Sequence, residues 1–165
     1  MPHIETKRLL IITLTPEIME AALLGRDKLE KAISYDVSSE WPMDVYKQFF
    51  PYKIQQFKES PAVNDWEGMV ILKDKQLIIG DIGFKGGPNE KGIIDLGYSV
   101  IPSQRRKGYA TEMANAMVNW GVVQSGVEQV VATSDPDNIA SKRVLEKSGF
   151  HKVKQTNDTI YWLYS

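Results

Sequence analysis

The 165-residue sequence contains no cysteine. This absence excludes a disulfide framework, thiolate metal sites and a cysteine nucleophile, and it fits a protein kept in a reducing compartment. No apolar run approaches the roughly 18 residues that a membrane span needs. The charged start "MPHIETKRLL" also lacks the apolar segment of a secretory signal. We therefore expect a cytoplasmic protein with no membrane partner and no bound metal.

The chain also lacks an excess of charge of either sign, with 20 basic and 21 acidic residues. Because nucleic-acid-binding domains carry a broad basic surface, RNA binding through the local run "QRRK" is a weak hypothesis, and we expect no nucleic-acid partner. Hydrophobic residues make up 42% of the sequence, enough for one packed core. We expect a single domain over residues 1–165, as a monomer or a homodimer.

The first half of the chain changes from a strand pattern to helices. The run "TKRLLIITL" ends just before Pro16, and proline favours the first turn of a helix. Residues 16–58 are expected to be mostly helical, with breaks at Gly25, Pro42 and Pro51.

The second half predicts a mixed α/β sheet. Two β-rich runs in "WEGMVILKDKQLIIGDIGF" flank the turn-like "KDKQ", and "KGGPN" ends the second run before a third strand, which predicts an antiparallel meander. Strands and helices then alternate, which is typical of the α/β class. The sequence predicts strands at 93–101, 127–134, 150–155 and 159–164, with helices at about 106–125 and at 139–147.

The segment "SQRRKGYA" places three cations where a strand ends and a helix begins. The first amide groups of a helix have no intrahelical partner and carry partial positive charge, so this position favours phosphate. Gly108 allows the backbone close to a ligand, while cations at a helix start oppose the helix dipole and gain nothing for local stability. We interpret the segment as a pyrophosphate site formed by Arg105, Arg106, Lys107, Gly108, Tyr109 and Ala110.

Two familiar phosphate motifs are missing. The sequence has neither the G-x-G-x-x-G pattern of a dinucleotide fold nor the G-x-x-x-x-G-K-[ST] pattern of a P-loop. The segment "GGPNEKG" at 86–92 joins two predicted strands, and we interpret it as a hairpin loop. On the helix after the cations, apolar residues fall on one face, which we expect to be core: Ala110, Met113, Ala114, Met117 and Gly121.

Three segments together resemble the GNAT N-acetyltransferase superfamily. The pattern R-x-x-G-x-A at Arg105, Gly108 and Ala110 is similar to its acetyl-coenzyme A pyrophosphate loop. The opening "IETKRLLI" resembles the ribosomal-protein alanine acetyltransferase branch, although Ile11, Ile12 and Thr13 stand where relatives often carry Leu-Arg-Pro. A later segment, "DNIASKRVLEKSGF", matches at Asn138, Ser141, Glu146, Lys147, Gly149 and Phe150.

The resemblance implies a sheet of about seven strands, splayed between the fourth and fifth, with about four to five helices. The pantetheine arm of acetyl-coenzyme A would lie in the opening and pair with the backbone of Leu96, Tyr98 and Val100. Asn138 and Ser141 would also contact the cofactor, and Asn138 is equally suited to cap the helix that follows it.

The resemblance also implies direct attack of an amine on the thioester, with oxyanion stabilisation near the Val100 N–H. Many relatives carry a tyrosine as the proton donor where this chain has Leu145, so Ser141 is the remaining candidate. Asp95 and Glu67 are alternative candidates for the general base.

The predicted activity is acetyl transfer from acetyl-coenzyme A to a primary amine of a small molecule or peptide, with an α-amino group as the favoured acceptor. Asp36, Glu40 and Asp44 lie in the segment expected to frame that acceptor. Two alternatives stay open: an acyl-coenzyme A-binding module without turnover, and a polyamine or aminoglycoside acetyltransferase.

Overall fold

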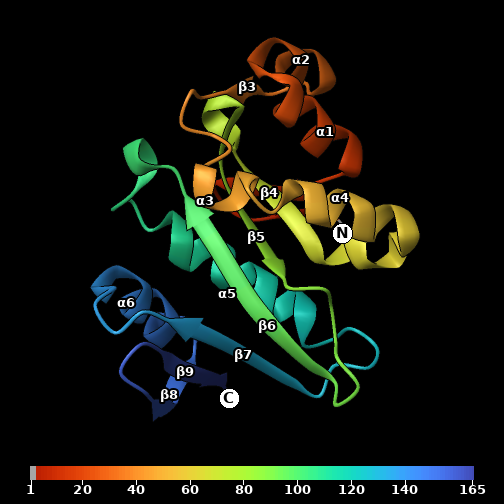
Figure 1. Ribbon diagram of the computed structural model, residues 1–165. Helices are drawn as coiled ribbons and strands as arrows, with labels where there is room; N and C mark the ends of the chain where they lie inside the picture. The colour runs from red at the N-terminus through yellow and green to blue at the C-terminus, as the bar shows by residue number, and fades with distance from the viewer. Residues whose placement is uncertain (1–2) are drawn as a thin grey trace.

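The computed structural model describes residues 3–165 and contains strands from both ends of the chain in one sheet. Figure 1 shows six labelled α-helices around this sheet. The strands are β1 (Ile4–Glu5), β2 (Leu9–Thr13), β3 (Asp36–Val37), β4 (Glu67–Leu72), β5 (Leu77–Phe84), β6 (Ile93–Val100), β7 (Gln129–Ser134), β8 (Phe150–Gln155) and β9 (Ile160–Tyr164). The α-helices are α1 (Pro16–Leu24), α2 (Arg26–Ala32), α3 (Asp44–Lys47), α4 (Phe50–Glu59), α5 (Tyr109–Gly121) and α6 (Ile139–Lys147).

The sheet is mixed, as the sequence predicts. Its strand order is β1-β2-β4-β5-β6-β7-β9-β8, with β3 pairing β5. The pairs β3/β5 and β6/β7 are parallel, and the other pairs are antiparallel. The meander β4-β5-β6 and the predicted bounds of α6 are confirmed. The segment 86–92 is the connection between antiparallel β5 and β6, as expected.

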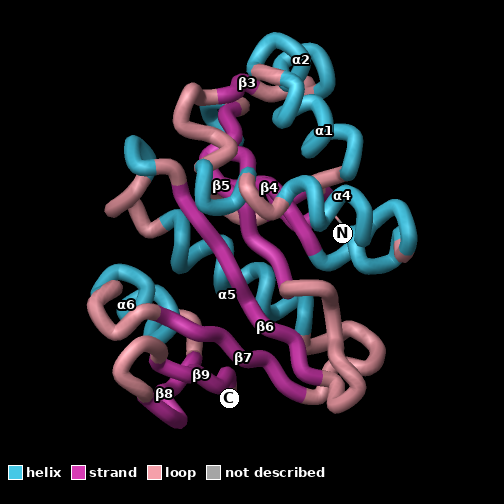
Figure 2. Tube along the Cα trace, in the orientation of Figure 1, coloured by secondary structure: helices cyan, strands magenta, loops and turns pink. Residues whose placement is uncertain are grey.

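The predicted splay lies between β6 and β7, which are the fourth and fifth strands when the two-residue strands β1 and β3 are left out. Their parallel pairing runs from Ile93 opposite Gln129 to Leu96 opposite Ala132. Strand β6 continues to Val100, and there its paired residues lie on β5 alone. Figures 1 and 2 show the two strands diverging beyond this point, with α6 following β7. The opening therefore leaves one backbone edge of the second half of β6 without a strand partner.

Helices α3 to α5 lie on both faces of the central strands. Side chains alternate between the two faces of a strand, so Gly83 and Phe84 point to opposite sides of β5. Gly121 of α5 packs against Phe84 and Ile94, where an added Cβ would lie 2.7 Å from the Phe84 ring. Gly83 belongs to the other face, toward α3 and α4, which Figure 1 shows over β4 and β5.

The predicted apolar stripe of α5 is largely confirmed. Met113, Ala114, Met117 and Gly121 are buried, while Ala110 is half-buried at the first turn. These side chains join the continuous core between α5 and the sheet. The methionines are therefore packing residues, as their spacing predicts.

Two local predictions were wrong. Pro51 does not break a helix but lies in the first turn of α4, where its missing N–H costs no hydrogen bond. Helix α5 begins at Tyr109 rather than at about 106, because Gly108 before it has φ 81°. The six α-helices of residues 3–165 roughly fit the expected count of about four to five. No helix in this described part of the chain is long and apolar enough to cross a membrane.

Candidate active site

The loop between β6 and α5 turns twice through left-handed backbone. Arg106 has φ 63° and Gly108 has φ 81°. Such residues turn N–H groups toward one side and form anion-binding concavities, and here the concavity adjoins the N-terminus of a helix. The left-handed conformation is uncommon for arginine, so the loop holds Arg106 in a backbone state that a relaxed chain rarely visits.

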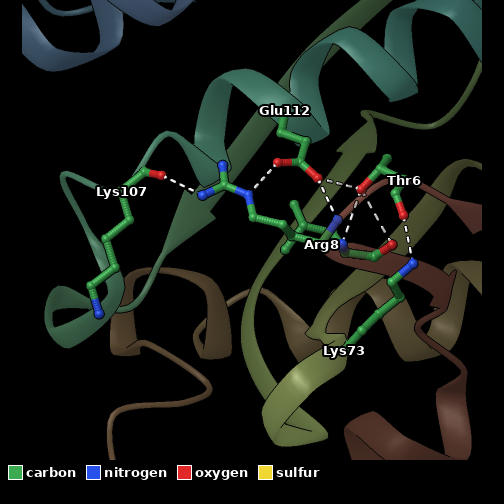
Figure 3. A network of polar contacts seen from close by, with 6 residues as sticks. Thr6, Arg8, Lys73, Lys107 and Glu112 are labelled. Atoms are coloured by element: carbon green, nitrogen blue, oxygen red, sulfur yellow. Dashed lines mark hydrogen bonds and ion pairs between the residues drawn. The ribbon is translucent and has the colours of Figure 1, made fainter.

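Residues 6–8, which connect β1 and β2, form a clamp on this loop, as Figure 3 shows. Arg8 Nε donates to Glu112 Oε2 at 2.7 Å, and an Arg8 terminal nitrogen donates to the Lys107 carbonyl at 2.9 Å. Thr6 Oγ1 and the Arg8 N–H both donate to the other oxygen of Glu112, at 2.7 and 2.9 Å. The Arg8 guanidinium also lies 4.5 Å from the centre of the Tyr109 ring. The "TKR" segment of the resemblance therefore shapes the loop from outside.

Glu112, in the first turn of α5, is the hub of this clamp. Burial raises the pKa of its carboxyl, but the hydrogen bonds from Thr6 and Arg8, together with the Arg8 charge, outweigh burial and hold the pKa below its usual value. The carboxylate is therefore committed to Thr6 and Arg8, although an acid so close to an anion site would otherwise repel the ligand.

Two of the three loop cations bond to groups of the protein itself, whereas we expected all three to face a ligand. Arg105 Nε donates to the Val100 carbonyl at 2.8 Å, so this side chain supports the end of β6. Lys107 Nζ donates to Gln104 Oε1 at 3.1 Å. All three residues are exposed. Within the described residues 3–165, Arg106 is the one of the three without a hydrogen bond or ion pair, so its guanidinium is the loop cation best placed to meet a phosphate.

A pair of hydroxyls bridges the opening between β6 and α6. The Tyr98 hydroxyl and Ser141 Oγ lie 3.0 Å apart. Tyr98 belongs to the half of β6 beyond its pairing with β7, and Ser141 lies in the first turn of α6. Burial raises the Tyr98 pKa while the bond to Ser141 lowers it, with a net upward shift, so the phenol keeps its proton at neutral pH.

Asn138 caps α6, one of the two roles that the sequence predicts for it. Its Oδ1 accepts the Ser141 N–H at 3.0 Å. Leu145, at the position where relatives often carry tyrosine, is fully buried in the core. The Tyr98 hydroxyl is thus a phenol supplied from another element, and the sequence analysis considered only the backbone of this residue.

The face of the sheet opposite α5 carries a pocket of about 370 Å³ under α3 and α4. We call it the α3–α4 pocket. It is lined by Val45, Tyr46, Phe49, Tyr52, Lys53, Glu67, Asp81, Ile82, Gly83, Lys85 and Gly97. Helices α3 and α4 therefore contribute one wall of the pocket.

Glu67 reaches this pocket and is mostly buried. Its Oε1 accepts from Lys53 Nζ at 2.9 Å. Gly83, opposite Glu67 in the β4/β5 register, has no room for a side chain, since an added Cβ would lie 2.6 Å from Glu67 Oε2. The glycine therefore leaves room for the Glu67 carboxylate and for the Trp66 carbonyl, which would lie equally close to an added Cβ.

Asp81 is the main functional candidate that the sequence analysis missed. It is 5% exposed, lines the pocket, and accepts hydrogen bonds from Trp41 Nε1 and Ser99 Oγ, both at 3.2 Å. Burial raises its pKa to about 7, against the hydrogen bonds from Trp41 and Ser99 and the Lys53 charge, which lower it; the Glu67 charge adds to the rise. Perturbed carboxyls in pockets are frequent at functional sites.

The other predicted carboxylates lie outside the lining of the pocket. Asp95 Oδ2 accepts from Lys85 Nζ at 3.1 Å, and it reaches the pocket only through that lysine. Glu40 is bonded to the Ser103 hydroxyl, on the loop after β6. Asp36 and Asp44 are likewise absent from the lining. The acid groups of the pocket are instead Glu67 and Asp81.

The site divides between the two faces of β6. One side has the left-handed loop, the unpaired edge of β6 and the hydroxyl pair, which offer hydrogen-bond donors to an anion. The other side has the α3–α4 pocket, which holds the carboxyl groups of Glu67 and Asp81. Among residues 3–165 there is no group of three or more histidine or acidic side chains arranged to hold a metal ion.

Comparison with known proteins identifies the class. The family model described as "Acetyltransferase (GNAT) domain" matches residues 8–151, and the chain therefore belongs to the GNAT acetyltransferase family. It is 30% identical to the uncharacterized N-acetyltransferase YjdG of Bacillus subtilis (strain 168), over 99% of this chain and 98% of that protein. These similarities make the chain an N-acetyltransferase of that family.

Two solved structures share the fold at lower identity. The ribosomal-protein-S5-alanine acetyltransferase of Vibrio fischeri has a TM-score of 0.66 and 17% identity, covering 99% of this chain and 95% of that one. A RimL ribosomal alpha-N-protein acetyltransferase in complex with coenzyme A has a TM-score of 0.65 and 13% identity, covering 98% and 96%. The resemblance to the alanine acetyltransferase branch thus extends to the fold.

Proposed function

We propose that this chain transfers the acetyl group of acetyl-coenzyme A to an α-amino group by direct attack. The proposal rests mainly on the end of β6/β7 pairing at Leu96. Beyond it, the edge of β6 has no strand partner between the left-handed loop and the Tyr98–Ser141 pair. Acetyl-coenzyme A supplies the activated thioester. Family membership and the coenzyme A complex of a structural neighbour support this choice of donor.

In the proposed reaction the amine nitrogen forms a bond to the thioester carbonyl carbon, and the carbon–sulfur bond breaks. The electron pair of that bond passes to sulfur, which takes a proton from the Tyr98–Ser141 hydroxyl pair. A carboxylate of the α3–α4 pocket, Glu67 or Asp81, removes the proton that the amine loses. The Val100 N–H is the proposed donor to the carbonyl oxygen, at the place where β6 ends.

The favoured acceptor follows from amine ionisation. An α-amino group with a pKa near 8 is neutral in roughly a fifth of molecules at pH 7.4, whereas a lysine-like amine with a pKa near 10.4 is about 0.1% neutral. A base whose pKa is near 7 is matched to the first group and poorly matched to the second. Asp81, with a pKa raised to about 7, therefore favours the α-amine.

The test uses two versions of one peptide that also contains a lysine. One version has a free α-amine and an acetylated lysine, and the other has a blocked α-amine and a free lysine. We expect thiol release and a mass increase of one acetyl group with the first, at a kcat/KM more than about tenfold above the second. Spermidine and an aminoglycoside complete the panel. Preference for the free lysine or for a polyamine would refute the α-amino assignment, and binding of acetyl-coenzyme A without thiol release would favour the non-catalytic alternative.

A further inference from the structure

The mouth of the α3–α4 pocket is apolar and exposed. Val45, Phe49 and Tyr52 are 56%, 52% and 67% exposed, and all three line the pocket. Scattered exposed apolar side chains are normal, but a group of them around one hollow marks a binding surface. An apolar group held among them would be removed from water on several sides.

Two glycines lie in the floor of the pocket. Gly83 on β5 and Gly97 on β6 are register partners, so two adjacent positions on this face carry no side chain. Asp81 precedes Gly83 by two residues and therefore shares its face of β5. A ligand entering past Phe49 would reach the glycines and end at a carboxyl group.

The charges of the pocket leave one carboxyl group for a cation. Glu67 is paired with Lys53 at 2.9 Å, and Lys85 is paired with Asp95 at 3.1 Å. The hydrogen bonds of Asp81 come from two neutral groups, Trp41 and Ser99. A ligand with one amine can pair with Asp81. Further amines would meet Lys53 and Lys85, and like charges at such distances repel.

We propose that the acceptor is a primary amine on an apolar body: a hydrophobic N-terminal residue or an arylalkylamine. The apolar group lies among Val45, Phe49 and Tyr52, and the nitrogen points toward Asp81. This assignment rests on the proposed function and narrows its acceptor. The pocket volume of about 370 Å³ lies in the lower part of the range for small-ligand sites, which suits one aromatic ring with a short chain.

Binding is measured first, so that the pocket is tested apart from catalysis. The full chain is loaded with coenzyme A and titrated calorimetrically with 2-phenylethylamine, ethanolamine and spermidine. We expect 2-phenylethylamine to bind at least about tenfold more tightly than either of the others, the discrimination that an apolar pocket typically gives.

Kinetic measurements then distinguish the two possible kinds of acceptor, a peptide N-terminus and a small arylalkylamine. The acceptors are 2-phenylethylamine and tetrapeptides that differ only in a first residue of phenylalanine or serine. A higher kcat/KM for the phenylalanine peptide than for 2-phenylethylamine identifies a protein or peptide end, and the reverse order identifies a small amine. Either order supports the proposal if the serine peptide is at least about tenfold worse.

Variants of pocket residues test whether the preference for an apolar acceptor arises in the α3–α4 pocket. Phe49→Ala should remove most of the preference for phenylalanine over serine, and Phe49→Leu should retain most of it. Gly97→Val should fill the floor and weaken the binding of both acceptors. The variant should still fold, because the nearest atom to an added Cβ belongs to the flexible side chain of Lys85, at 3.3 Å. Val123→Ala, at a 77% exposed apolar residue outside the pocket, is the matched control and should change neither value.

The outcomes are distinguishable. A preference for ethanolamine, spermidine or the serine peptide overturns the apolar acceptor and leaves the acetyltransferase function standing. Selective binding of 2-phenylethylamine that Phe49→Ala abolishes, without thiol release from acetyl-coenzyme A for any amine, supports the pocket assignment and overturns the proposed function. An unchanged preference in Phe49→Ala overturns the pocket assignment.

Discussion

Asp81 is a carboxyl group whose burial opposes its ionisation. Its pKa is 3.8 in the unfolded chain and about 7 in the folded one. Below about pH 4 both states are protonated. Between about pH 4 and 7 the folded state retains a proton that the unfolded state has released, so stability falls as pH rises. Above about pH 7 the difference is constant.

The first prediction is that Asp81→Asn flattens this dependence. One pKa unit corresponds to about 1.4 kcal/mol, so the wild-type chain should lose up to a few kcal/mol between pH 4.5 and 8 through this group. Urea unfolding at four pH values measures the difference. Ser99→Ala should act in the opposite sense, because it removes a hydrogen bond that lowers the pKa of Asp81. Parallel curves for wild type and Asp81→Asn would show that Asp81 does not titrate in this range.

The hydroxyl pair yields the second prediction. Because Tyr98 and Ser141 lie 3.0 Å apart and act on one leaving group, Tyr98→Phe should lower kcat by about 10²-fold and Ser141→Ala by less. The affinity for acetyl-coenzyme A should change little in either variant, since the proton is needed only in the transition state. The double variant should be close to Tyr98→Phe alone. Wild-type kcat values in both single variants would show that neither hydroxyl is the proton donor.

At the scale of elements, the β6–α5 loop carries the third prediction. Arg106→Glu reverses the charge of the exposed loop cation while keeping the α5 core intact. We expect at least about a tenfold loss of acetyl-coenzyme A affinity, or about 1.4 kcal/mol, with unchanged circular dichroism. Gly108→Val should lose more, because it strains the backbone at φ 81°. Calorimetry that shows wild-type affinity in Arg106→Glu would refute the phosphate role of the loop.

The clamp behind the loop yields the fourth prediction. Arg8→Met keeps an unbranched apolar stem but removes the side-chain contacts to Glu112 and to the Lys107 carbonyl. We expect KM for acetyl-coenzyme A to rise about threefold to tenfold with little change in kcat, because Arg8 positions the loop from outside. Lys73→Met is the control. It removes a bond to the Thr6 carbonyl of the same segment and leaves the loop contacts in place. Equal effects of both variants would mean that Arg8 acts only on the amino-terminal segment.

Elements were predictable where local pattern and tertiary structure agree. The bounds of α6 follow from an Asn138 cap and a following glycine, both of which are local signals. The two-residue strand β3 was missed because its pairing with Leu77 and Ile78 comes from a distant segment. Pro51 was misassigned because proline marks both the interruption and the first turn of a helix.

At the scale of the whole molecule, the two sides of the site differ in how far the sequence predicts them. The proposed cofactor side lies on contiguous segments such as 105–110 and 138–141, so a motif can reveal it. The proposed acceptor side combines Glu67, Asp81 and residues of α3 and α4, which come together only when the sheet forms. Asp81 lies in a strand run, "LIIGDIGF", where nothing local distinguishes a functional carboxyl group from an edge residue.

The last prediction concerns the whole chain. The proposed ligand contacts the loop after β6, the edge of β6 and α6, so binding would join the two sides of the splayed sheet. Acetyl-coenzyme A at about 100 times its Kd should stabilise the folded state by about 2.7 kcal/mol. For a chain of this length that corresponds to a rise in Tm of about 5 to 10 °C.

Two comparisons decide whether the loop contributes to that rise. S-acetylpantetheine has the thioester arm without the pyrophosphate, so at equal concentration it should raise Tm much less. In Arg106→Glu the difference between the two ligands should become smaller, because one of the proposed phosphate contacts is lost while the loop amides remain. Equal shifts by both ligands on the wild-type chain would place the binding energy in the β6 edge alone and would remove the loop from the site.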